Sequence, residues 1–103
     1  NVPVLQNFIT MRITPHQHQI IKETIMDLDA CASVFLFGSR VDDHARGGDI
    51  DLLVISQQID FMGKLRALGT LHQKLGDQKI DLAIFSDLSK PFAQVAHASS
   101  ILL

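Results

Sequence analysis

Three aspartates stand where two apolar segments begin, and their spacing is suited to metal and phosphate chemistry. Asp49 and Asp51 open the segment DIDLLVIS, and Asp81 is the third residue of KIDLAIF. Side chains of a β-strand alternate between its two faces, so Asp49 and Asp51 share one face while Ile50 points to the other. Two ionised carboxylates held this close repel each other, and a divalent cation such as Mg²⁺ removes that conflict. The pattern therefore predicts a metal site.

The loop before this segment carries groups that bind phosphate. Gly38 allows a close approach of the backbone, and Ser39 offers a hydroxyl and an N–H. Arg40 and Arg46 are forked donors suited to phosphate oxygens, although each could equally be a surface residue paired with a loop aspartate. Phosphate donors next to metal ligands are typical of phosphoryl or nucleotidyl transfer, in which catalysis is mostly positioning and charge neutralisation.

Regular elements that could position these residues are visible in the pattern. Thr14-Pro15-His16-Gln17 predicts a capping box at the start of a helix that ends near Asp29. Strands are predicted over residues 33–37, 50–56 and 79–85, and a terminal strand or its stub over 101–103. A second helix is predicted over 60–75, and Ser89 is expected to cap a last helix over 91–97. The inward stripe of the second helix is predicted to be Phe61, Leu65, Leu68, Leu71 and Leu75.

The element order α-β-β-α-β-α predicts an α+β fold, in which a small mixed β-sheet is flanked by helices. The strand, helix and strand over residues 50–85 form a crossover unit, which joins two parallel neighbours. Because the amino ends of parallel strands lie together, we expect Asp49, Asp51 and Asp81 to converge at one edge of the sheet.

The motif resembles a known superfamily. GSR followed by DIDLL, with a later strand-borne Asp81, is similar to the Gly-Ser … Asp-x-Asp signature of the DNA polymerase β-like nucleotidyltransferases, and the short length resembles their minimal nucleotidyltransferase (MNT) branch. The resemblance implies the polymerase β palm-like fold. It also implies that Asp49, Asp51 and Asp81 hold two Mg²⁺ ions and that Asp81 helps to deprotonate the acceptor hydroxyl. Gly38 and Ser39 would then hold the phosphates of a nucleoside triphosphate, usually ATP.

The resemblance also implies a partner. MNT proteins are frequently paired with a small helical HEPN protein, which they bind as antitoxins and in some cases adenylylate. The chain departs from the family pattern at Gly48, where a serine is common, but this leaves the metal ligands intact. Two alternatives stay open. One is a non-catalytic module that neutralises a partner by contact, and the other is a small-molecule nucleotidyltransferase that needs a second subunit.

Composition sets the remaining expectations. The chain has 103 residues, which fits one domain spanning residues 1–103, with residues 1–10 as an N-terminal extension. A formal charge of −2 argues against direct nucleic-acid binding. No 18-residue apolar run is present, and Cys31 is the single cysteine, so we expect a cytoplasmic protein without a membrane span. Cys31 lies between two alanines and is expected to be buried.

Overall fold

The computed structural model describes residues 13–37, 50–76 and 78–103. In these ranges the order is α-β-β-α-β-α-β, built from α2 (Pro15–Leu28), β1 (Ser33–Phe37), β2 (Ile50–Ile55), α3 (Phe61–Leu75), β3 (Ile80–Phe85), α4 (Pro91–Ala98) and β4 (Ile101–Leu102). The predicted α+β class is confirmed, and the terminal residues add a short fourth strand. The predicted element boundaries agree with the structure to within one residue for the central strands and helices.

The four strands form one mixed sheet in the order β3-β2-β1-β4. β1 pairs antiparallel with both β2 and β4, whereas β2 and β3 are parallel. The parallel pair follows from the α3 crossover, since two parallel strands cannot be joined by a tight turn. β3 and β4 are therefore the two edge strands.

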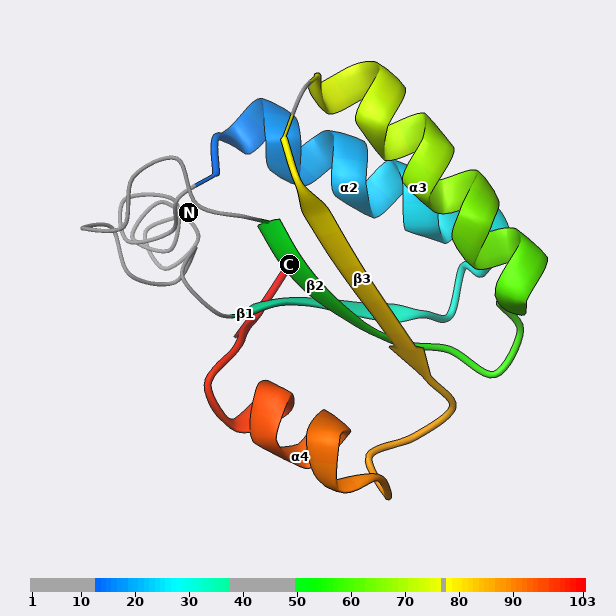
Figure 1. Ribbon diagram of the computed structural model, residues 1–103, viewed down its shortest axis with the longest axis vertical. Helices are drawn as coiled ribbons and strands as arrows, with labels where there is room; N and C mark the ends of the chain where they lie inside the picture. The colour runs from blue at the N-terminus through cyan, green and yellow to red at the C-terminus, as the bar shows by residue number, and fades with distance from the viewer. Residues whose placement is uncertain (1–12, 38–49, 77) are drawn as a thin grey trace.

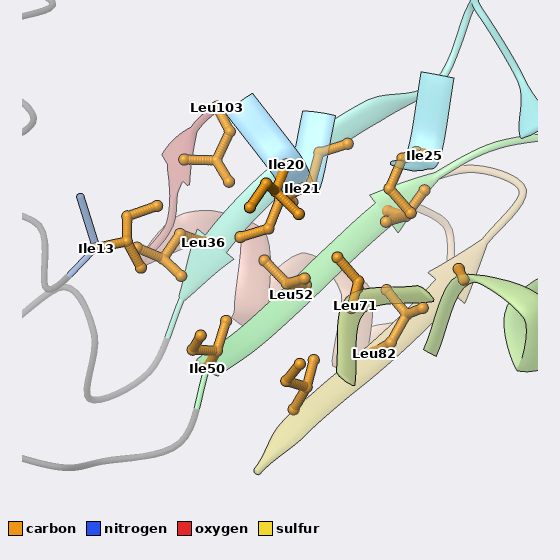
Figure 2. Packing of buried hydrophobic residues seen from close by; sticks show 14 of the residues in the cluster. Ile13, Ile20, Ile21, Ile25, Leu36, Ile50, Leu52, Leu71, Leu82 and Leu103 are labelled. Atoms are coloured by element: carbon orange, nitrogen blue, oxygen red, sulfur yellow. The ribbon is translucent and has the colours of Figure 1, made fainter. Parts of the chain in front are cut away.

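The sheet separates two layers of unequal size. α2 and α3 cover one face and the shorter α4 covers the other (Figure 1). The face under α2 and α3 carries the main hydrophobic core, in which alternate residues of the strands meet the helices (Figure 2). Its fully buried members include Ile21, Ile25, Leu36, Ile50, Leu52 and Leu71. The α4 face has a second, smaller cluster around Leu53, Ala93 and Ala96.

The start of α2 has the predicted capping box. The backbone N–H of Gln17 donates to Thr14 Oγ1 over 3.1 Å, and the Thr14 N–H donates to Gln17 Oε1 over 2.9 Å. Thr14 is exposed and Gln17 is only partly buried, so these two bonds stabilise the helix start largely without help from the core. Replacing Thr14 leaves a helix N–H without its side-chain acceptor.

We expect Thr14→Ala to lower the free energy of unfolding by about 1 kcal/mol. For a domain of this length that corresponds to a fall in Tm of about 4–8 °C. Thermal unfolding monitored by circular dichroism measures the change. Thr14→Ser keeps the hydroxyl and serves as the control, so an equal loss in both variants would contradict the capping role.

The prediction that Phe61 and Leu65 lie on the inward side of α3 is wrong. Phe61 and Leu65 are 69% and 46% exposed, whereas Ala67 and Leu71 are buried. Leu68 and Leu75 are partly buried against the main core. α3 packs on α2 as well as on the sheet, and the small side chain of Ala67 permits this close approach. The buried side of the helix is therefore turned toward α2, away from Phe61 and Leu65.

Two further expectations are corrected at turns. The N-cap of α4 is Lys90 and makes no side-chain capping bond, while Ser89 donates its N–H to Asp87 Oδ1 over 2.9 Å. Ser89 is thus part of the turn after β3 instead of the cap. Cys31 is exposed, because it lies in the turn between α2 and β1.

Candidate active site

Asp51 and Asp81 lie side by side at the start of the two parallel strands. The register pairs Asp51 with Asp81 directly, between the pairs Ile50–Ile80 and Leu52–Leu82. Neighbouring strands are about 4.8 Å apart, so the two carboxylates reach the same small volume. The register places Asp51 beside Asp81, as the predicted parallel strands require, while their role as site residues stays a prediction. Asp49, their predicted third partner, lies outside the described residues.

Both carboxylates belong to the face that carries α4. Ile50, Leu52, Ile80 and Leu82 belong to the core under α2 and α3, and side chains of a strand alternate. Asp51 and Asp81 therefore lie on the opposite face, with Leu53 and Ala83 of the smaller cluster. Asp81 is exposed and Asp51 is partly buried, so ligands can approach them from solvent. Nothing of the core has to be opened to reach them.

A hollow of about 250 Å³ adjoins Asp81. Phe37 and Phe92 line it from the α4 side, and Lys64 and Leu68 of α3 line it around the β3 edge. Phe37 is paired with Asp51 across the antiparallel β1–β2 ladder, so the aromatic ring and the two acids share one end of the sheet. The ring centroids of Phe37 and Phe92 are 6.0 Å apart in an edge-to-face arrangement.

Phe37, Phe92 and Lys64 were not among the residues predicted for the site. Phe37 ends the predicted strand 33–37, and an antiparallel pairing of that strand with 50–55 places it opposite Asp51. No comparable sequence pattern indicates that Phe92 or Lys64 lies near the two aspartates. Their position depends on how α4 and α3 pack on the sheet, which local patterns do not give.

The donor set fits a hard divalent cation. Two adjacent carboxylates without other ligand types favour Mg²⁺ over a zinc site, which prefers nitrogen and sulfur. Within residues 13–37, 50–76 and 78–103, no three His, Cys, Asp or Glu side chains are grouped around a common point. Asp51 and Asp81 would supply part of such a site, and the third ligand expected from the sequence is Asp49.

The phosphate-binding half of the prediction lies outside the described residues. Gly38, Ser39, Arg40 and Arg46 all belong to the segment 38–49. The residues that flank this segment are Phe37 and Ile50, which lie on the adjacent strands β1 and β2. These four residues stay predictions.

Asp29 shows that another carboxylate of the chain has a structural role. Ser56 Oγ donates to Asp29 Oδ2 over 2.6 Å, and the Cys31 N–H donates to Asp29 Oδ1 over 2.9 Å. The same serine hydroxyl accepts from the N–H groups of Gln58 and Ile59. This buried network fastens the end of α2 to the end of β2, at the opposite end of β2 from Asp51.

Outside the site, no helix in the described ranges is long and apolar enough to cross a membrane.

The mixed sheet with a crossover helix and the paired acids at the start of β2 and β3 agree with the fold expected of a nucleotidyltransferase. Residues 19–103 match the family model described as "Polymerase beta, Nucleotidyltransferase". The match extends from within α2 to the last residue, and the chain belongs to this family. Its general activity is therefore nucleotidyl transfer. No curated protein matches the sequence.

Proposed function

We propose that this protein is a Mg²⁺-dependent adenylyltransferase that transfers AMP from ATP to a hydroxyl group of a partner protein. The observation that carries the proposal is the direct register of Asp51 with Asp81 on one exposed face of the sheet, in a chain of the nucleotidyltransferase family. Nucleotidyl transfer needs carboxylate oxygens for metal and a base for the acceptor hydroxyl. The pair provides both.

Each residue has a defined role in this proposal. Asp49, Asp51 and Asp81 would hold two Mg²⁺ ions, which neutralise phosphate charge and fix the geometry of an in-line displacement. Asp81 accepts the proton of the attacking hydroxyl. The oxygen of the acceptor then bonds to the α-phosphorus of ATP, and pyrophosphate leaves. Gly38, Ser39, Arg40 and Arg46, which lie in the sequence between β1 and β2, would hold the triphosphate.

A protein acceptor suits the shape of the described site. The hollow beside Asp81 is open to solvent, and Phe92, which lines it, is 52% exposed. A site with this much exposed apolar surface does not enclose a small polar acceptor by itself, whereas a docking protein can cover it. A HEPN-type helical partner, neutralised as a toxin in the cytoplasm, is the proposed acceptor.

Mass spectrometry of the acceptor tests the proposal. The protein is incubated with Mg²⁺, ATP and a candidate HEPN partner encoded beside it, and the partner is expected to gain the mass of one AMP unit. Label from α-³²P-ATP should move to the partner, and label from γ-³²P-ATP should not. Transfer of the γ label, or no adduct with any neighbouring partner, would overturn it.

The non-catalytic alternative makes a different prediction for the same pair of proteins. If the protein neutralises its partner by contact alone, an Asp51→Asn variant neutralises the partner as well as the parent does. Under the proposed function the same variant binds the partner but leaves it active. A toxicity assay in cells that express both proteins distinguishes the two.

A further inference from the structure

The outer edge of β3 is an unpaired strand edge next to the candidate site. β3 is at the edge of the sheet, and no strand of the described residues pairs with its outer side. It is six residues long and its register with β2 is continuous from Ile80 to Phe85. The strand contains no proline and no bulge, the usual devices that prevent an edge from pairing.

Backbone geometry shows which groups face outward. The carbonyls of Lys79 and Phe85 accept from the N–H groups of Ile50 and Ser56, over 2.9 Å in both cases. Backbone groups alternate sides along a strand, so the carbonyls of Asp81 and Ala83 also face β2. The N–H and C=O groups of Ile80, Leu82 and Ile84 consequently face the open edge. These outward-facing N–H and C=O groups can form backbone hydrogen bonds with one additional strand.

Two hollows lie along this edge and share one cationic side chain, that of Lys64. The hollow beside Asp81 includes Ile80 and Leu82, and a second hollow of about 250 Å³ includes Phe61 and Ile84. Lys64 of α3 lines both. Asp60, the other charged residue of the second hollow, already accepts from the Gly63 N–H over 2.8 Å as the cap of α3. Lys64 pairs with no carboxylate of the described residues.

Exposed apolar side chains border the edge on both faces. Phe61 of α3 lines the second hollow and is 69% exposed, and Phe92 of α4 lines the hollow beside Asp81 and is 52% exposed. An added strand would place alternate side chains against α3, beside Lys64, and the remaining ones on the face of Asp81. An extended segment that is apolar with one acidic residue on one face, and carries a hydroxyl on the other, therefore complements the backbone groups of this edge and places its acidic residue opposite Lys64.

We infer that the acceptor protein docks by adding an extended, acidic segment to the open edge of β3, which places its hydroxyl residue beside Asp81. This inference rests on the proposed function for the identity of the occupant. The docking itself needs neither ATP nor Mg²⁺, so it is measured separately from transfer.

The probe is a short acetylated and amidated peptide of alternating valine and threonine in which one central valine is replaced by glutamate. A matched peptide carries lysine at that position. We expect the glutamate peptide to bind the protein about tenfold more tightly than the lysine peptide, because it pairs with Lys64. Lys64→Glu should reverse this preference, and Lys74→Glu, on the exposed far turn of α3, should leave it unchanged.

Hydrogen exchange locates the bound peptide. At saturation the amides of Ile80, Leu82 and Ile84 should exchange more slowly, whereas those of Asp81 and Ala83 are already protected by pairing with β2. N-methylation of the peptide amides that face β3 should remove binding without altering the protein.

Three results would overturn the inference: absence of added protection at Leu82 and Ile84, binding that survives N-methylation, or concentration-dependent protection of this edge without peptide. The last would identify a second copy of the chain as the occupant. AMP transfer without edge protection would refute only the docking. Edge protection without AMP transfer to any acceptor would refute only the proposed function.

Discussion

We expect Asp81→Asn to lower the rate of AMP transfer by at least about 100-fold while the domain stays folded. Loss of a carboxylate that holds metal and accepts a proton costs several kcal/mol of transition-state stabilisation, and about 1.4 kcal/mol is tenfold in rate. The side chain of Asp81 is exposed and contributes no core contact. Asparagine has nearly the same shape, and its neutral amide does not repel Asp51. Transfer of α-³²P label under single-turnover conditions measures the rate, and thermal unfolding measures the stability.

Asp87→Asn is the matched control for this variant. Asp87 follows β3 at the other end of the strand, and its carboxylate accepts from Ser89. That hydrogen bond and nearby Lys90 lower the pKa of Asp87, but the residue is remote from Asp51 in the register. Asp87→Asn should retain full transfer activity. If Asp81→Asn keeps the activity of the parent, or melts well below it, Asp81 is not the proposed base and ligand.

The sequence predicted the paired carboxylates because the evidence for them is local. The crossover unit over residues 50–85 requires parallel strands, and the position of each aspartate within its strand then determines that Asp51 meets Asp81. The capping box at Thr14 depends on neighbours in the chain and was predicted for the same reason.

Features that depend on packing between distant elements were not predictable in this way. The hollow beside Asp81 combines Phe92 of α4 and Lys64 of α3, and their meeting depends on how both helices sit against β3. The same reason explains the error at α3. Its apolar stripe is compatible with several rotations of the helix, and contact with α2 selects one that buries Ala67 and exposes Phe61.

The largest stability effect is expected at the centre of β2, where adjacent leucines point into different layers. Leu52 belongs to the main core under α2 and α3, and Leu53 belongs to the smaller cluster under α4. Both side chains are fully buried. A leucine-to-alanine change costs about 2–5 kcal/mol, and the cost rises with the volume of the cavity that remains.

We expect Leu52→Ala to cost about 4 kcal/mol and Leu53→Ala about 2–3 kcal/mol. Leu52 is surrounded by fully buried branched side chains from both helices, which have little freedom to fill a cavity. The neighbours of Leu53 include the partly buried rings of Phe35, Phe37 and Phe85, which can move inward. Urea unfolding measures both values. A larger loss at Leu53 would contradict this order.

The relative size of the two stability losses is relevant to function, because Asp51 and Asp81 lie on the same face of the sheet as Leu53. A domain of this size is stable by only about 5–15 kcal/mol, so the main core must supply most of that margin. The α4 face then carries less of the stability, and its aromatic side chains keep enough exposure to meet a ligand or a partner. Leu53→Ala should consequently reduce transfer more than stability alone explains, because Phe37 moves away from Asp51. Leu52→Ala, measured at a temperature where it is fully folded, should transfer AMP at the rate of the parent.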